Sequence, residues 1–122
     1  SHKTPSPLLS CLVGSEMCIR VSPYGLQKRV DVARGLATNP SVLLLDEPAA
    51  GLPTAEALEM MEHVIEYAEH IGCGVIVIEH NVELVADVCE RVIVMDAGKI
   101  LADGTAQSVM QNADVIAAYL GT

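Results

Sequence analysis

The first regular pattern of apolar residues along the chain begins after position 25 and has the period of a helix. Residues 26–38 place Val30, Ala33, Leu36 and Ala37 on one face, with charged side chains elsewhere. An Asn-Pro pair comes directly afterwards, and the residue before a proline is unsuited to a helix. The sequence therefore predicts a helix over 26–38.

Three apolar runs of strand length come next along the chain. Residues 41–46 are apolar up to an acidic end, and Pro48 then ends the strand because it has no N–H to donate. Residues 75–79 and 91–95 are further runs of the same kind. Their near-continuous Val, Ile and Leu content predicts strands that are buried on both faces of a parallel sheet.

Helical patterns separate these three strands. Thr54 is a suitable N-cap for a helix that Gly72 closes, and a shorter helix is expected over 81–88. Two strand–helix–strand units in succession imply parallel strands joined by crossover helices. The fold class is therefore α/β.

The end of the chain has a different character. Residues 96–99 form a turn signal that leads into a fourth strand over 99–103, so a β-hairpin is expected. Thr105 can cap a short helix, and Asn112 can cap a last helix over 113–120 that ends at a glycine. The predicted domain is an α/β sheet with a C-terminal hairpin and short helices.

Composition excludes several classes of function. The chain has 122 residues and a net charge of −9, and it contains no Phe or Trp. A nucleic-acid-binding domain needs a basic surface and often aromatic residues for base stacking, so nucleic acid is not an expected partner. No apolar run approaches the ~18 residues of a membrane span, so any membrane association must come through partner subunits. The four cysteines form no CxxC motif and are expected to be free thiols in a reducing compartment.

The most informative residues follow the first strand. Asp46 and Glu47 stand where ligands bind in open parallel sheets, beyond the carboxyl ends of the strands. A carboxylate there suits Mg²⁺, which prefers oxygen ligands, and a second carboxylate can orient or deprotonate a water that attacks a phosphate. A pair of turn carboxylates without function has the same appearance. His80 follows the next strand and is expected on the same rim, which favours the functional interpretation.

Four segments in order resemble a known family. They are residues 22–30, 33–36, 43–48 and 79–80, and they resemble the signature loop and helix, the Walker B strand and the switch histidine of ABC ATPases. The resemblance covers residues 21–122 and implies the C-terminal part of a P-loop NTPase fold. Residues 46–52, 78–81 and 115–121 look most like branched-chain amino acid importers. The lipopolysaccharide-export and urea-import ATPases remain alternatives.

The resemblance implies a role for each matching residue, with ATP and Mg²⁺ as cofactors. Asp46 would hold Mg²⁺ through water, Glu47 would be the catalytic base, and His80 would be the switch. The signature would meet the γ-phosphate of an ATP held by the opposite subunit, and the interface loop (D-loop) would cross between the two subunits. The signature residues are Pro23, Tyr24, Gly25, Leu26 and Gln27, and the interface-loop residues are Ala50, Gly51, Leu52 and Pro53.

The same resemblance implies partners and a location. They are a second ABC ATPase subunit and transmembrane permease subunits, at the cytoplasmic side of the inner membrane. Three residues depart from the usual pattern of the family. Pro23 stands where a serine is common, although this fits the branched-chain type. Leu26 replaces a Gln or Glu, and Pro53 replaces an Asp or Asn, which would weaken coupling between the two sites.

One required element is missing from these residues. No G-x-x-x-x-G-K-[ST] phosphate loop occurs, since the only Gly-Lys pair, Gly98-Lys99, lacks the rest of the motif. Residues 1–20 resemble no part of the family and are expected to be a disordered or artefactual leader. The isolated chain is therefore expected to be inactive and, with part of its sheet uncovered, poorly soluble. The alternative of another class is a short protein that binds a partner ATPase without hydrolysing ATP.

Overall fold

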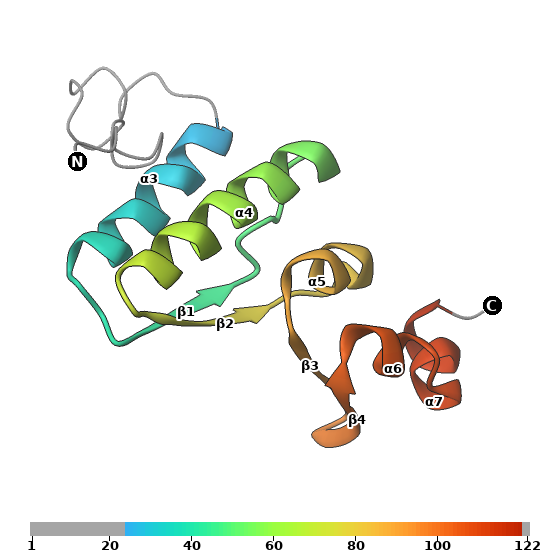
Figure 1. Cartoon of the computed structure of the whole chain (residues 1–122). Helices are drawn as coiled ribbons and strands as arrows, with labels where there is room; N and C mark the ends of the chain where they lie inside the picture. The colour runs from blue at the N-terminus through green and yellow to red at the C-terminus, as the bar shows by residue number, and fades with distance from the viewer. Residues whose placement is uncertain (1–23, 121–122) are drawn as a thin grey trace. The chain divides into compact units, whose positions relative to one another are not determined.

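The structure is a computed structural model that describes residues 24–120 (Figure 1). The described chain forms two units that divide between Glu79 and His80, and each is considered by itself. The predictions for residues 1–20, for Pro23 and for the final glycine lie outside the described residues. None of the described helices combines the length and apolar character that a membrane crossing requires.

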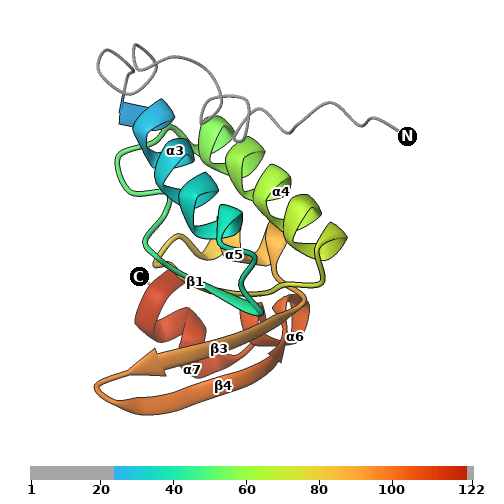
Figure 2. The same cartoon turned by 90° about the vertical axis from the view of Figure 1, so that its left-hand side faces the viewer.

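The first unit consists of two helices and two strands. Its elements are α3 (Tyr24–Ala37), β1 (Val42–Asp46), α4 (Thr54–His70) and β2 (Gly74–Ile78). The strands β1 and β2 are parallel, with a register that runs from Val42 opposite Gly74 to Asp46 opposite Ile78. The predicted strand–helix–strand unit is therefore confirmed. The helices α3 and α4 lie side by side over the same face of this sheet (Figures 1 and 2).

The core of the first unit lies between these helices and the sheet. Apolar side chains of α3, β1 and α4 are buried there, and Met60, Met61, Val64 and Ala33 are wholly inaccessible to solvent. The remaining buried apolar residues of this unit are Val30, Val32, Leu36, Leu43, Leu45, Ala57, Ala68 and Cys73. The predicted inner face of α3 is correct except at Ala37, which is exposed because it ends the helix.

The two ends of α4 differ in how their backbone groups are satisfied. Thr54 is the first helical residue and not the N-cap, so that prediction was wrong. Pro53 occupies the N-cap, and its side chain can accept no hydrogen bond. At the other end Gly72 has φ +71°, and the N–H of Cys73 donates to the carbonyl of Ala68 at 2.8 Å. This is the glycine-dependent helix ending that the sequence predicted.

The second face of the β1–β2 sheet is exposed. Val42, Leu44, Ile76 and Ile78 retain 52%, 70%, 55% and 59% of their accessible surface. The apolar runs predicted strands covered on both faces, and the missing phosphate loop predicted that part of the sheet would be uncovered. Within the described residues only one face is covered. These four side chains, called the open face below, form a contiguous apolar surface because their strands are paired.

An open face of this kind favours self-association, which substitution on it should reduce. Leu44 and Ile76 are directly opposite each other across the strand pair. Replacing Leu44 by Lys and Ile76 by Glu together places opposite charges side by side, so the sheet itself is not penalised. We expect the double variant to contain more monomer than the unaltered chain at equal concentration, as measured by sedimentation velocity. Equal aggregation of the two proteins would contradict the assignment of the open face as the cause.

The second unit is built around an antiparallel hairpin. It contains α5 (Val82–Val88), β3 (Arg91–Asp96), β4 (Lys99–Thr105), α6 (Ala106–Met110), α7 (Ala113–Val115) and the π-helix η1 (Ile116–Leu120). Figure 2 shows β3 and β4 running beside each other. Positive φ angles at Ala97 and Gly98 provide the tight turn between them. The predicted hairpin is confirmed. The prediction that β3 would extend the β1–β2 sheet as a parallel strand was wrong, because β3 and β4 form a separate sheet.

Side-chain contacts fix the ends of this unit's elements. Thr105 and Asn112 accept hydrogen bonds from the first turns of α6 and α7, so both predicted caps are confirmed. Arg91 makes a bidentate pair with Asp103 across the hairpin, and this hydrogen-bonded pair lowers the pKa of the Asp103 carboxyl. The predicted last helix over 113–120 is α-helical only as far as Val115, after which it widens into the π-helix η1.

Candidate functional site

The two predicted carboxylates stand at the carboxyl end of β1. Asp46 is the last residue of the strand, lies opposite Ile78 of β2, and is exposed. The backbone N–H of Glu47 donates to the carbonyl of Ile78 at 2.8 Å, so hydrogen bonding to β2 continues one residue beyond the end of β1. Both carboxylates therefore occupy the strand-end position that the sequence predicted.

Glu47 has an unusual backbone conformation. Its φ of +47° lies in the left-handed region, which costs a residue with a side chain about 1–2 kcal/mol. Such conformations persist only where surrounding contacts determine them, and they are concentrated at functional sites. Here the conformation stands where the strand ends at Asp46 and the turns of the following loop begin.

The interface loop continues from this point as two consecutive turns. The N–H of Ala50 donates to the carbonyl of Glu47 at 3.2 Å, and the N–H of Leu52 donates to the carbonyl of Ala49 at 3.0 Å. Gly51 has φ +79°, which a residue without Cβ adopts without strain. The loop then enters α4 directly at Thr54. Residues 50–53 are thus a compact segment of defined conformation between β1 and α4.

A residue that the sequence analysis did not single out holds this loop. The Oε1 atom of Glu79 accepts a hydrogen bond from the backbone N–H of Ala49 at 2.9 Å. Glu79 follows β2 directly, and the contact joins positions 30 residues apart. Its only sequence signal was its place beside His80 at the end of a strand.

Gly25 lies at the start of α3, which begins at Tyr24, two residues before the predicted start. It is buried, and a Cβ added there would overlap the Oε1 atom of Glu56 and come within 3.3 Å of the Cδ2 atom of Leu52. A side chain at this position would therefore require the Glu56 carboxylate to move away and Leu52 to shift slightly. Leu26 and Gln27 of the predicted signature are exposed on the first turn of α3.

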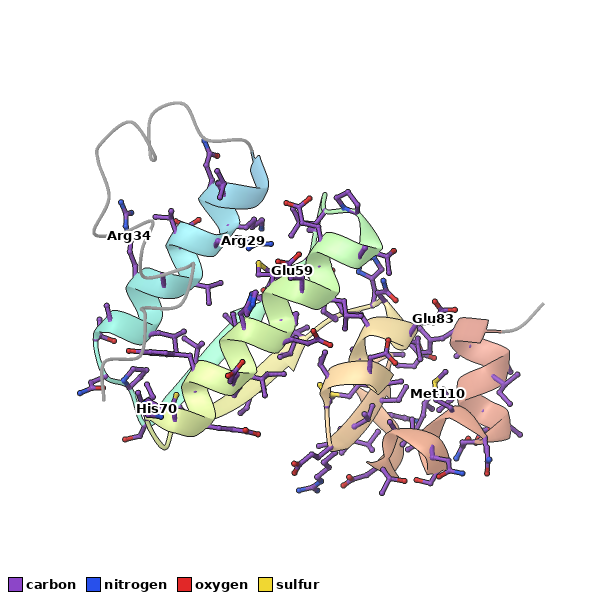
Figure 3. All side chains as sticks on the ribbon, turned by 45° about the horizontal axis from the view of Figure 1, so that its top comes forward. Arg29, Arg34, Glu59, His70, Glu83 and Met110 are labelled. Carbon is purple, nitrogen blue, oxygen red and sulfur yellow. The ribbon has the colours of Figure 1, made fainter. Side chains whose placement is uncertain are left out.

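Charged residues also connect α3 with α4 at their outer surface. Arg29 and Glu59 point toward each other (Figure 3), with 4.0 Å between Nη2 and Oε2. The Glu59 side chain is well exposed, so this pair contributes little to stability. The packing of Gly25 and the aliphatic core therefore determine how the two helices associate.

His80 begins the second unit. It is exposed and directly precedes Asn81, whose side chain caps α5 by accepting a hydrogen bond from the N–H of Leu84 at 3.2 Å. The short distance along the chain from β2 keeps His80 near the end of that strand. Its expected place on a common rim with Asp46 and Glu47 stays a prediction.

The donor set suits Mg²⁺ better than a transition metal. Within residues 24–120 no group of three or more His, Cys, Asp or Glu side chains could enclose a metal ion. Mg²⁺ needs no such group, because it is bound in proteins by one or two carboxylates together with water and substrate phosphates. Asp46, an exposed oxygen donor at a strand end, fits that requirement.

Comparison with known sequences gives consistent matches. A family model described as "Branched-chain amino acid ATP-binding cassette transporter" matches residues 99–122. The high-affinity branched-chain amino acid transport ATP-binding protein LivG of Escherichia coli K12 is 43% identical over 98 residues, which are 80% of this chain and 38% of that protein. The lipopolysaccharide export system ATP-binding protein LptB of Haemophilus influenzae is 42% identical over 97 residues, or 80% and 40% of the two chains. The chain thus spans about two-fifths of these relatives.

Solved structures give the same fold. The ADP conformation of MJ1267, an ATP-binding cassette of an ABC transporter, superposes with a TM-score of 0.79 at 29% identity, over 96% of this chain and 48% of that one. The cbiO1 protein of Clostridium perfringens, part of the ABC transporter complex cbiONQ, gives a TM-score of 0.70 at 33% identity, over 79% and 38%. The arrangement of β1, α4 and β2 therefore has close counterparts among these cassettes.

Proposed function

The chain belongs to the ATP-binding subunits of ABC transporters, of the branched-chain amino acid type, and on this premise we propose that it supplies the water-activating part of an ATPase that drives amino acid import. The observation that carries the proposal is the conformation at the end of β1. There an exposed Asp46 is followed by Glu47 in a left-handed backbone conformation, held to β2 by a hydrogen bond. Two carboxylates thus stand in succession at one strand end, the second on a backbone of defined conformation.

Each carboxylate has a distinct task in this proposal. Asp46 would hold Mg²⁺ through water, and the ion would supply positive charge beside the phosphate oxygens. Glu47 accepts the proton of the attacking water, and a general base of this kind accelerates a reaction by about 10²–10⁴-fold. His80, next to the end of β2, contacts the terminal phosphate and holds that water in line.

The first turn of α3 has a separate task. Helix N-termini attract anions because their backbone N–H groups point outward and carry a partial positive charge. We assign residues 23–27 to the γ-phosphate of an ATP bound by a second ATPase subunit. Permease subunits complete the transporter at the cytoplasmic side of the inner membrane.

The phosphate-binding part of the site must come from residues other than these 122, because no phosphate loop occurs among them. In this proposal the isolated chain does not hydrolyse ATP. The competing function, a short protein that binds a partner ATPase without hydrolysis, shares that expectation. It differs in requiring no contribution from Asp46 and Glu47.

Branched-chain amino acids are favoured over lipopolysaccharide as the transported substrate. The two groups of relatives are nearly equal in identity, at 43% and 42%, so identity does not separate them. The family model that matches residues 99–122 supports the proposal, since its description names the branched-chain type. This support comes from the last 24 residues of the chain, which include β4 and the C-terminal helices.

Uptake of leucine tests this function. We define a chimera in which residues 24–122 replace the corresponding part of the Escherichia coli relative, whose remaining sequence is retained. In a strain that lacks that relative, the chimera is expected to restore uptake of radiolabelled leucine. A stable, membrane-associated chimera that restores no uptake would contradict the proposed substrate class, and an Asp46→Ala chimera provides the inactive control.

A further inference from the structure

The loop that follows Glu47 is fixed from one side by a single carboxylate. We propose that Glu79 is a positioning residue, whose side chain sets the conformation of residues 47–52 and thereby directs Glu47 and the interface loop. This inference rests on the proposed function for the roles of those two groups. The contact itself is independent of that function.

Two hydrogen bonds hold the loop. Their acceptors belong to Ile78, the last residue of β2, and to Glu79, which follows it. The carbonyl of Ile78 accepts from the N–H of Glu47 at 2.8 Å, and the carboxylate of Glu79 accepts from the N–H of Ala49 at 2.9 Å. The first bond continues the regular strand pairing. The second is made by a side chain, so it is the one that substitution can remove without altering the backbone of β2.

The contact is well suited to fixing the turn. A hydrogen bond to a carboxylate is stronger than one between neutral groups, and Glu79 is only half-exposed, so water competes less with it. Without this acceptor the N–H of Ala49 would depend on solvent. The two anchored amides, those of Glu47 and Ala49, flank the turn at which Glu47 adopts a conformation that is not its intrinsic preference, so that conformation depends on both anchors.

The far end of the same loop is held by packing. Leu52 lies against Gly25 at the start of α3, where a Cβ would come within 3.3 Å of its Cδ2 atom. The loop is thus anchored to the end of β2 at Ala49 and to α3 at Leu52. Glu79 is also covalently next to His80, the proposed switch.

Amide hydrogen exchange of the 122-residue chain tests this role. Mass spectrometry at low micromolar concentration limits aggregation, and fragmentation of the peptides can resolve the amide of Ala49. In Glu79→Ala this amide is expected to exchange about tenfold faster or more, whereas Glu79→Gln should remain close to the unaltered chain because its amide oxygen still accepts. Glu66→Ala, an exposed change on α4, is the matched control and should alter nothing at Ala49.

Two results would overturn the inference. One is an Ala49 amide that exchanges at the same rate in Glu79→Ala and in the unaltered chain. The other is faster exchange throughout β1 and α4 in both Glu79 variants, which would show a general structural role. Neither readout involves ATP, so failure of the leucine-uptake test with the expected exchange result would reject the proposed function alone.

Discussion

Replacing Glu47 by Gln in the chimera is expected to lower kcat for ATP hydrolysis by about 10²–10⁴-fold, the usual contribution of a general base. Glutamine is nearly isosteric with glutamate and preserves the left-handed turn, but it does not accept a proton from water. Affinity for ATP should change little, because Glu47 acts on the attacking water. Steady-state phosphate release and nucleotide titration of the purified chimera measure the two quantities separately.

The matched control for this variant is Glu66→Gln. Glu66 is an exposed glutamate on α4, so the same chemical change there should leave kcat unaltered. A loss of less than tenfold in Glu47→Gln would show that another group activates the water. A parallel loss of ATP affinity would instead indicate that Glu47 serves nucleotide binding.

Replacing Met61 by Ala is expected to destabilise the first unit by about 2–5 kcal/mol, the usual cost of truncating a buried methionine. Met61 is fully buried at the inner face of α4, where the helix packs over the sheet beside α3. A small domain has a total stability of only about 5–15 kcal/mol, so this change approaches complete unfolding. Urea denaturation followed by circular dichroism measures the shift in midpoint.

Met95 provides the comparison within the same chain. It is 54% exposed on β3, and its known contact, acceptance of a hydrogen bond from the Tyr119 hydroxyl, uses the backbone carbonyl. Met95→Ala should therefore shift the midpoint by far less than Met61→Ala. Equal shifts in the two variants would mean that the described core does not govern unfolding.

The sequence predicted the elements well where local chemistry determines them. The runs at 41–46 and 75–79 became β1 and β2, and Gly72, Thr105 and Asn112 act at the helix ends as expected. The prediction of Thr54 as the N-cap was wrong. The helix begins one position earlier than that prediction requires, so Thr54 is its first residue and Pro53 is the N-cap. The prediction was also wrong for β3, which pairs with β4 in a two-stranded sheet and not with β2.

Some residues of the candidate site could be predicted from the sequence, and others could not. Asp46 and Glu47 could be found because a strand end in a parallel sheet is a known place for ligands. Glu79 was missed because its contact with Ala49 joins distant segments and depends on a conformation of Glu47 that no local pattern encodes. Gly25 was interpreted only through approach of a phosphate, whereas the Glu56 carboxylate and Leu52 also lie close to it. The exposed face of β1 and β2 followed from the missing phosphate loop and could be anticipated only in outline.

The most direct test of the account is the rate of ATP hydrolysis by purified protein, measured side by side for the isolated chain and the chimera. We predict no hydrolysis above background for the 122 residues alone, and Mg²⁺-dependent hydrolysis by the chimera that is lost in Glu47→Gln. Hydrolysis by the isolated chain would contradict the claim that the phosphate-binding part lies elsewhere. A folded chimera that binds ATP but hydrolyses it no faster than its Glu47→Gln variant would contradict the claim that these residues activate the water.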